Sequence, residues 1–255
     1  MDMTITVFLG GMVGGAMNAL AGGGSFVTLP IMIAAGVPPV FANASSTVAL
    51  FPGGLASAWA YRDGSRSVGS VSLRALLAST LCGGLIGALL LLWTSSAAFT
   101  FVLPWLLLVA FVALAFGRRI GDALRARVRI HPNAVLTVQC ALGIYGGYFG
   151  GAVGIMMIAM WGLFDNRALK HLNAPRTLLV SAANTVAVLA FIIANAVSWP
   201  ETRTMLIGAL IGGYGGARIG RHMPSHVIRT ITLFATGCIT LMFFLKTYLP
   251  TLLQL

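Results

Sequence analysis

The sequence predicts an all-α integral membrane protein made of two inverted repeats. Of its 255 residues, 58% are hydrophobic and 8% are charged, whereas roughly 25% of the residues in soluble domains are charged. Its apolar runs are long enough to cross a bilayer as helices, which takes about 20 residues. One pattern of glycines and polar residues also occurs twice. We expect each repeat to contain a broken, re-entrant helical hairpin and three transmembrane helices, and a water-soluble enzyme is excluded.

The charge of the chain is distributed as in a membrane protein rather than a nucleic-acid-binding one. Sixteen Lys and Arg against five Asp and Glu give a formal net charge of +11. The basic residues lie between the apolar runs and form no patch interleaved with aromatic residues, so no nucleic-acid partner is expected. The lipid bilayer is the expected partner of the apolar surface, and the oligomeric state is left open.

The three cysteines do not form a recognisable metal or redox motif. Cys82, Cys140 and Cys238 each lie alone inside an apolar stretch, without the spacing of metal ligands or of a disulfide framework. The cysteines are therefore expected to be small buried hydrophobic residues. We expect no cofactor and no metal site.

The first repeat is expected to occupy 1–116. It opens with an apolar hairpin at 4–35, which Gly22-Gly23-Gly24 interrupt. The segment that follows this interruption is too short to cross the bilayer alone, because a crossing takes about 20 residues. Three full crossings are expected to follow, at 43–61, 71–93 and 99–116.

The second repeat, 134–255, is expected to copy this arrangement. Its apolar hairpin at 134–164 is interrupted by the stretch from Gly150 to Gly154. Three full crossings follow, at 175–194, 204–220 and 230–249. The basic segment 117–133 is the expected linker between the repeats.

The distribution of Lys and Arg predicts the orientation, because these residues accumulate in cytoplasmic loops. If both hairpins return to the side from which they start, fourteen of the sixteen Lys and Arg fall on one side, and only Arg203 and Lys246 fall opposite. The linker 117–133 is then cytoplasmic and both termini lie outside. The alternative, eight full crossings, requires an 11-residue stretch to span the bilayer.

The repeat rests on three matches, two at one shift and the third displaced by a single deletion. The run from Asn43 to Thr47 recurs as the run from Asn173 to Thr177, at a shift of 130 residues, and Gly24 and Gly154 are separated by the same shift. Further on, Gly83-Gly84 matches Gly212-Gly213 at a shift of 129. Each repeat contains an odd number of crossings, so the second copy enters the membrane from the opposite face, as in many secondary transporters.

Two broken helices of this kind predict a substrate site. Unwound backbone is tolerated at membrane depth only where it is buried in protein or lines a cavity. Ser25 is the expected N-cap of the helix after the first interruption, and helix starts suit anions because of their free N–H groups and positive dipole end. No acidic residue lies within a predicted crossing, which favours a negatively charged substrate.

The candidate substrate-binding residues flank the interruptions or open the helix that follows each hairpin. Arg176 is the expected partner of the negative charge, with a membrane-interface anchor as its alternative role. Asn18 and Tyr148 either orient the substrate or satisfy freed carbonyl groups, and Asn184 is a further, weaker candidate. The full set is Asn18, Gly22, Gly23, Gly24, Ser25, Asn43, Thr47, Tyr148, Gly151, Gly154, Asn173, Arg176 and Thr177.

Two sets of motifs resemble one family. In the first half they are the run Asn18 to Phe26, Pro30, Gly36-Val37-Pro38-Pro39, Ala42-Asn43-Ala44 and Pro52-Gly53. In the second half they are Tyr148-Phe149-Gly150, Gly154-Ile155-Met156, Asn173-Ala174 and Asn184. Together they resemble the TauE/SafE (sulfite exporter) transporters over nearly the whole chain. The sequence departs from the family at Ala152, where Gly is common, and at Pro175-Arg176-Thr177, where many members have a hydrophobic residue, Lys and Asn.

The resemblance implies a multi-pass transporter of the inner membrane, in several family members an exporter of sulfur-containing anions. We therefore expect a secondary transporter, and not an enzyme, that exports a small anion such as sulfite, thiosulfate or an organosulfonate by alternating access. Two alternatives remain open: a membrane-embedded sulfur-relay enzyme that uses Cys82 or Cys238 as a nucleophile, and a passive anion channel. The sequence does not set the coupling ion.

Overall fold

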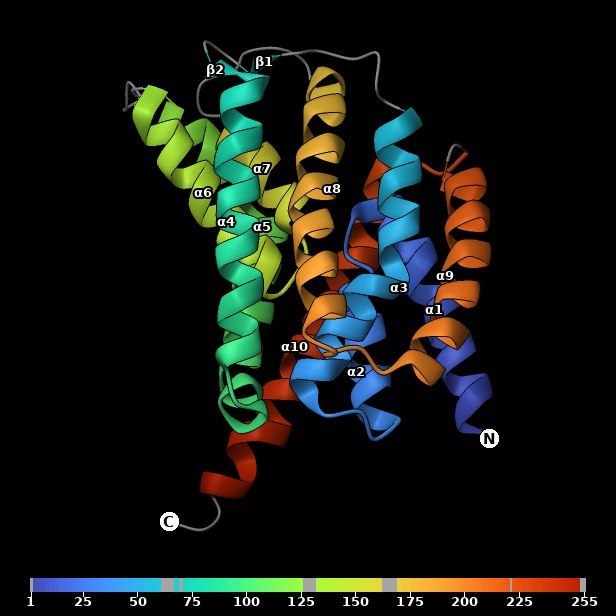
Figure 1. The fold of residues 1–255 in the computed structure, drawn as a ribbon. Helices are drawn as coiled ribbons and strands as arrows, with labels where there is room; N and C mark the ends of the chain where they lie inside the picture. Colours follow the sequence, from blue (N-terminus) through green and yellow to red (C-terminus); the bar gives the residue numbers. More distant parts are fainter. Residues whose placement is uncertain are drawn as a thin grey trace.

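A computed structural model describes residues 2–60, 67–68, 71–125, 132–161, 169–220 and 222–252 (Figure 1). The described chain is helical apart from one antiparallel pair of short strands, β1 (Ser67–Val68) and β2 (Val71–Ser72). The helices of the first half are α1 (Met3–Ala21), α2 (Ser25–Ala34), α3 (Pro39–Ala60), α4 (Leu73–Trp93) and α5 (Ser96–Arg125). Those of the second half are α6 (Pro132–Tyr148), α7 (Val153–Trp161), α8 (Leu169–Ile193), α9 (Trp199–Gly220) and α10 (Ser225–Leu252).

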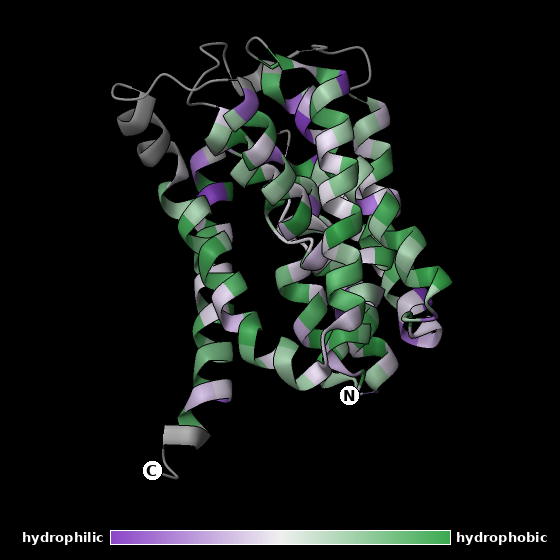
Figure 2. Ribbon diagram, turned by 60° about the vertical axis from the view of Figure 1, so that its left-hand side comes forward, coloured by the Kyte–Doolittle hydropathy of each residue, from purple (hydrophilic) through white to green (hydrophobic). Residues whose placement is uncertain are grey.

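The composition of the helices confirms the predicted all-α membrane protein. Within the described residues, five segments are long and apolar enough to cross a membrane: Met3–Ala21, Leu73–Trp93, Ser96–Gly117, Leu172–Ile193 and His226–Leu249. Large apolar side chains are also exposed on the outer faces, for example Trp93 and Ile193 with exposed fractions of 81% and 79%. Figure 2 shows hydrophobic residues along most of the length of the helices. Exposed apolar surface of this extent is typical of a protein embedded in lipid.

Two of the expected crossings, 43–61 and 204–220, are less apolar than the others. They correspond to α3 and α9, which have 22 residues each but are not among the five apolar segments. In α3 the cause is a buried polar stretch that includes Asn43 and Thr47. In α9 it is the combination of glycines with the charged residues near its ends, such as Glu201 and Arg218. Both helices also pack closely against other helices.

Several helices extend beyond the expected limits. The helix α5 continues to Arg125, and α8 begins at Leu169 with Pro175 inside it. Most of the expected linker 117–133 therefore belongs to α5 and α6, and its remaining part, 126–131, lies outside the described residues. Hydropathy alone missed these ends because charged residues continue a helix as readily as apolar ones.

Both expected hairpins contain a helix break. We call Gly22–Gly24 the first break and Phe149–Ala152 the second break, because no helix covers either segment. After the first break, α2 returns along α1: Gly14 lies against Thr28, and Gly10 against Ile31. The helix α1 alone has the length of a crossing, whereas α2 has ten residues. In Figure 1 the start of α1 and the end of α10 lie at the same end of the bundle, opposite β1 and β2.

Glycines bring α1 and α9 into backbone contact, with the two helices running in parallel. A Cβ atom at Gly11 would overlap the carbonyl oxygen of Met205, and one at Gly212 would overlap that of Met12. Small residues allow this close approach, which stabilises helix pairs in lipid through van der Waals contact. The contact occupies most of the length of α1.

The helices α4 and α6 form an equivalent pair. A Cβ atom at Gly83 would overlap the carbonyl oxygen of Cys140, and one at Gly147 would overlap that of Gly84. The first helix of each half thus packs against the fourth helix of the other half. Two related copies of one unit are expected to pack in this reciprocal way, and the inverted repeat itself stays a prediction.

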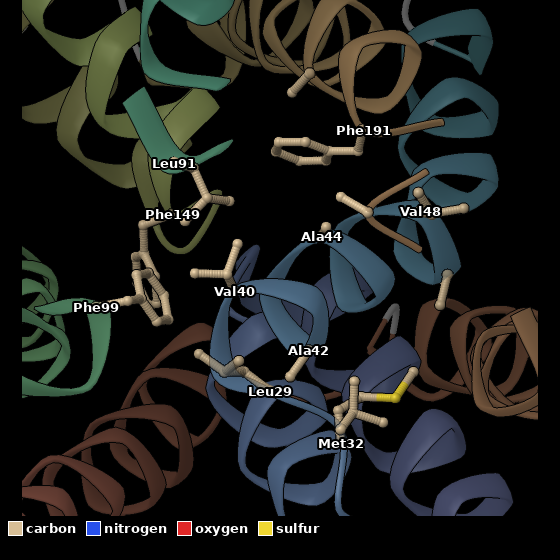
Figure 3. Close-up of a cluster of buried hydrophobic side chains, with 14 of the residues drawn as sticks. Leu29, Met32, Val40, Ala42, Ala44, Val48, Leu91, Phe99, Phe149 and Phe191 are labelled. Atoms are coloured by element: carbon tan, nitrogen blue, oxygen red, sulfur yellow. The ribbon is translucent and has the colours of Figure 1, made fainter. Parts of the chain in front are cut away.

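An apolar cluster fills the bundle at the end where α1 begins. It draws buried side chains from α2, the start of α3, the end of α4, the start of α5, the second break and the end of α8. Figure 3 labels ten of them: Leu29, Met32, Val40, Ala42, Ala44, Val48, Leu91, Phe99, Phe149 and Phe191. The rings of Phe26 and Phe149 meet edge to face with centroids 6.3 Å apart. This pair joins the two breaks on the side of the apolar cluster.

Candidate functional site

The two breaks face a common cavity of about 150 Å³, which we call the central cavity. Its walls come from α1, α2, α3, α7 and α8 together with residues of both breaks. The lining residues are Asn18, Ala19, Ala21, Gly22, Ser25, Thr47, Leu50, Gly54, Ser57, Gly150, Val153, Gly154, Ile155, Arg176, Thr177, Val180, Ser181 and Asn184. Of the candidates from the sequence, the cavity brings together Asn18, Gly22, Ser25, Thr47, Gly154, Arg176 and Thr177.

The first break is short and tightly packed. Gly22 ends α1 in the left-handed conformation, with a φ of 75°, and its N–H donates to the carbonyl oxygen of Asn18 at 2.9 Å. Gly24 is the N-cap of α2, and no side chain caps this helix. The expectation that Ser25 is the N-cap is therefore wrong: Ser25 is the first helical residue, and it lines the cavity instead.

The second break approaches the first one from the opposite wall. Gly150 has a φ of 78° and Ala152 a φ of 58°. A Cβ atom at Gly150 would lie 3.4 Å from the Thr47 hydroxyl and 4.0 Å from that of Ser25. Residues of the second half thus lie directly beside polar residues of the first half. Ala152 adopts a conformation that costs about 1–2 kcal/mol for an L-residue with a side chain.

Asn43 connects the two halves at this point. Its side-chain amide donates to the carbonyl oxygen of Tyr148, the last residue of α6, at 2.9 Å. A carbonyl at a helix end lacks an intrahelical partner, so this bond satisfies a group that the second break leaves open. Asn43 is 1% exposed and lies behind the cavity wall rather than in it. Its Oδ1 atom is buried without a hydrogen-bond partner.

Arg176 provides the charge of the site. Among the described residues that line the central cavity, it is the one with a charged side chain. Its Cγ and Cδ atoms lie 3.4 Å and 3.3 Å from the position that a Cβ atom of Gly154 would occupy. The absence of a side chain at Gly154 therefore lets the arginine lie against the start of α7. The side chain of Arg176 and the start of α7, where the helix dipole is positive, thus lie at the same place in the cavity wall.

The cavity also contains residues that the sequence analysis did not select. Ser181 lines it and donates to the carbonyl oxygen of Gly54 at 2.9 Å. Gly150 lines it in place of the expected Gly151. The helical period was the available signal for Ser181, because Thr177 and Ser181 are four residues apart and share one face of α8.

The remaining candidates lie outside the lining of the central cavity. They are Gly23, Gly24, Asn43, Tyr148, Gly151 and Asn173. The hydroxyl of Tyr148 donates to Thr94 at 3.3 Å, and its ring packs beside Phe99. Gly151 is buried against the ring of Phe149. The carbonyl oxygen of Asn173 accepts a bond from the Thr177 hydroxyl at 2.9 Å, as that of Asn43 does from Thr47.

A second cavity of about 610 Å³, which we call the vestibule, adjoins the central cavity. The two share Asn18, Ala19, Leu50 and Ser57 in their linings. The vestibule also includes Ala60 and Gly220, the last residues of α3 and α9. The central cavity is therefore approached from the end of the bundle opposite the apolar cluster.

Neither cysteine of the proposed sulfur relay faces the central cavity. Cys82 on α4 and Cys238 on α10 are exposed on their helices, and neither belongs to the lining. Within the part of the chain that the structure describes, no group of three or more His, Cys, Asp or Glu residues could hold a metal ion.

A family profile described as "Sulfite exporter TauE/SafE" matches residues 7–243. The chain belongs to the TauE/SafE family. The match includes both breaks and every described residue that lines the central cavity, and no solved structure matches the chain significantly.

Curated relatives of this TauE/SafE chain have similar lengths. A "Probable membrane transporter protein" of Haemophilus influenzae is 25% identical over 243 residues, which cover 94% of this chain and 93% of the relative. "Probable membrane transporter protein YfcA" of Escherichia coli K12 is 28% identical over 234 residues, covering 91% and 86%. "Probable membrane transporter protein ORF9" of a Sinorhizobium species is 26% identical, covering 90% and 88%. The family, these relatives and the apolar helices identify a multi-pass membrane transporter.

Proposed function

We propose that this protein is a secondary transporter that moves a small anion by alternating access between its two breaks. The observation that carries the proposal is the position of Arg176 and the start of α7 on one wall of a cavity that both breaks line. Helix starts bind anions through their backbone N–H groups. An arginine adds a charge-assisted interaction, which is stronger away from bulk water.

The lining of the central cavity supports a negatively charged substrate. Its described residues include hydroxyl, amide and guanidinium groups but no carboxylate. A carboxylate would favour a cation and repel an anion at this depth. The family description and the resemblance of the motifs suggest sulfite, thiosulfate or an organosulfonate, and export as the direction.

Alternating access requires two halves that exchange roles, and the fold supports this part of the proposal. The reciprocal contacts of α1 with α9 and of α6 with α4 fit two inverted repeats, 1–116 and 134–255. The vestibule adjoins the cavity at one end, and the apolar cluster fills the other end. A cavity with one filled end favours a transporter over a passive channel. With the linker 117–133 on the cytoplasmic side of the inner membrane, this arrangement corresponds to an inward-facing state.

Arg176→Ala tests the proposal directly. We expect the variant to bind sulfite and a simple sulfonate at least tenfold more weakly, because the site loses its charge, and Arg176→Lys to retain part of the affinity. Arg203→Ala is the matched control, since Arg203 is exposed near the start of α9 and lies outside the cavity. Binding is measured on purified protein in lipid nanodiscs, and transport on proteoliposomes loaded with the anion.

Undiminished anion binding and transport by Arg176→Ala would remove this residue from the site. If the wild-type protein bound none of these anions, the proposed substrate class would be wrong. Currents that do not saturate and show no exchange would instead favour a channel.

A further inference from the structure

The vestibule differs in chemistry from the central cavity that it adjoins. Fourteen of the seventeen described residues that line it are Gly, Ala, Leu or Ile, and none of the seventeen has a charged side chain. The central cavity, by contrast, is lined by Arg176 and by several hydroxyl and amide side chains. The vestibule is also the larger space, with about 610 Å³ against about 150 Å³. An apolar space of this size beside a charged site fits a ligand with two chemically different parts.

The vestibule lies between the second halves of α3 and α9. These helices run in the same direction (Figure 1) and are joined near their starts, where the backbone N–H of Ser198 donates to the Ser45 hydroxyl at 2.9 Å. Beyond this bond the vestibule separates 49–60 on α3 from 209–220 on α9, and α1 forms its inner wall. The vestibule is therefore a space between helices that continues to their last residues.

Apolar side chains border the opening of the vestibule. Leu210 and Tyr214, one turn apart on α9, line it and have exposed fractions of 47% and 71%. On α3, Ala56 and Ala60 also line it and are exposed. A charged group gains no partner from these side chains, whereas an apolar group is stabilised by leaving water beside them.

The two spaces are continuous, because Asn18, Ala19, Leu50 and Ser57 line both of them. A molecule with its charged head beside Arg176 can therefore extend past Leu50 into the vestibule. The ten residues from Leu50 to Ala60 correspond to about 15 Å along the axis of α3. A bare oxyanion in the central cavity makes no use of this length of apolar surface.

We propose that the vestibule holds the apolar tail of the transported anion while its charged head lies beside Arg176. The substrate class is then an amphiphilic anion, a sulfonate or carboxylate with an alkyl chain of several carbons, rather than a bare oxyanion. This inference rests on the proposed function, since the head occupies the same central cavity. The charge of Arg176 and the continuity of the two spaces select this occupant over an uncharged lipid chain.

A series of sulfonates that differ only in chain length tests the inference. Dissociation constants of methanesulfonate, 1-butanesulfonate and 1-hexanesulfonate are measured on wild-type protein in lipid nanodiscs, and empty nanodiscs report partition into the lipid. Each methylene that enters the vestibule is expected to tighten binding about two- to fourfold, as transfer of a methylene out of water does. We therefore expect 1-hexanesulfonate to bind at least roughly tenfold more tightly than methanesulfonate.

Gly53→Leu links the effect of chain length to the vestibule. Gly53 lines the vestibule but not the central cavity, and no atom lies within 4 Å of the position that its Cβ atom would occupy. A larger side chain there starts in open space and takes up room that the tail needs. The ratio of the methanesulfonate and 1-hexanesulfonate dissociation constants is therefore expected to fall severalfold. Gly215→Leu is the matched control, since Gly215 also has open space around it and lines neither cavity, and it is expected to keep the wild-type ratio.

Two outcomes overturn the inference and leave the proposed function intact. The first is equal affinity for the three sulfonates in the wild type, which would mean that water or a lipid chain fills the vestibule; this measurement stands even if Gly53→Leu fails to fold. The second is a wild-type ratio in both glycine variants, because the gain with chain length would then come from partition into the lipid. Binding of no sulfonate and no sulfite contradicts the inference and the proposed function together.

Discussion

The two breaks occupy equivalent positions but differ in how they are held and in what they present. The first break is packed within its own hairpin, where Gly24 lies against Gly14 and the Thr28 hydroxyl donates to the Gly24 carbonyl oxygen. The second break is held from the other half, by the bond from Asn43 to the Tyr148 carbonyl oxygen. The difference indicates that the first break is held within its own hairpin, whereas the position of the second break depends on the contact between the two halves.

The same contrast appears at the pair of positions Ser46 and Arg176, which the 130-residue shift makes equivalent. Ser46 is fully buried and hydrogen-bonds the Thr28 hydroxyl behind the first break. Arg176 lines the central cavity. The residue at this position thus contributes to packing in the first copy and supplies a charge in the second copy. A repeated motif predicts equivalent places in a fold but not equivalent functions.

The largest expected effect comes from adding one methyl group to each break and comparing the loss of stability. Gly24→Ala places a Cβ atom 2.5 Å from the Gly14 carbonyl oxygen and 2.7 Å from the Asn18 Cβ. We expect it to lower the free energy of unfolding by about 1–3 kcal/mol, since overpacking of this kind forces the backbone to shift. Thermal unfolding in detergent measures this loss.

Gly150→Ala is expected to act mainly on binding. Its Cβ atom would lie 3.4 Å from the nearest atom, the Thr47 hydroxyl, so the cost in stability is the left-handed φ alone, about 1–2 kcal/mol. The methyl group enters the cavity and is expected to weaken anion binding severalfold. Gly215→Ala, with open space around it, is the neutral control. A smaller loss of stability in Gly24→Ala than in Gly150→Ala would mean that the first break is not the more tightly packed one.

An unequal effect is expected from the two asparagines of the repeated motif. Asn43→Ala leaves the Tyr148 carbonyl oxygen without its partner, which costs about 1–3 kcal/mol for a buried group. The same change at the half-buried Asn173 is expected to cost less than about 1 kcal/mol, as for most partly exposed positions. Chemical or thermal unfolding of both variants measures which of them loses more stability. Equal losses would indicate that both asparagines hold a break.

The smallest effect is expected at Ala152, which precedes α7 in a left-handed conformation, and Gly22 at the end of α1 is its comparison. Ala152→Gly removes the strain at a φ of 58° but adds flexibility to the unfolded chain, so we expect a gain of at most about 1 kcal/mol. Gly22→Ala at a φ of 75° is expected to lose about 1–2 kcal/mol. The two variants are compared by their unfolding temperatures. A loss of stability in Ala152→Gly would show that the alanine methyl group contributes packing that outweighs its strain.

The features that could be predicted from the sequence are those that depend on local chemistry. Runs of glycine inside apolar stretches marked both breaks, because no lipid-exposed backbone tolerates such an interruption. Arg176 and Thr177 were found through the repeated motif. Helix ends were less accurate, since α8 starts six residues before the predicted crossing and includes Pro175.

The features that could not be predicted from the sequence depend on the register between helices that are distant in the chain. Ser181 enters the cavity because α8 crosses α3 at Gly54, 127 residues away in the sequence. Asn43 was selected as a ligand of the substrate, yet its amide binds a backbone carbonyl group 105 residues away, and the substrate role stays a prediction. Neither contact can be recognised from local hydropathy or residue spacing.

The glycine-mediated contacts of α1 with α9, and of α6 with α4, have a consequence for movement. Backbones in direct contact leave no side chain between them that can repack when one helix shifts against the other. We therefore expect each pair to move as one unit, and each unit contains one helix from either half of the chain. If the protein works by alternating access, as proposed, the predicted movement is a tilt of these two helix pairs relative to α3 and α8.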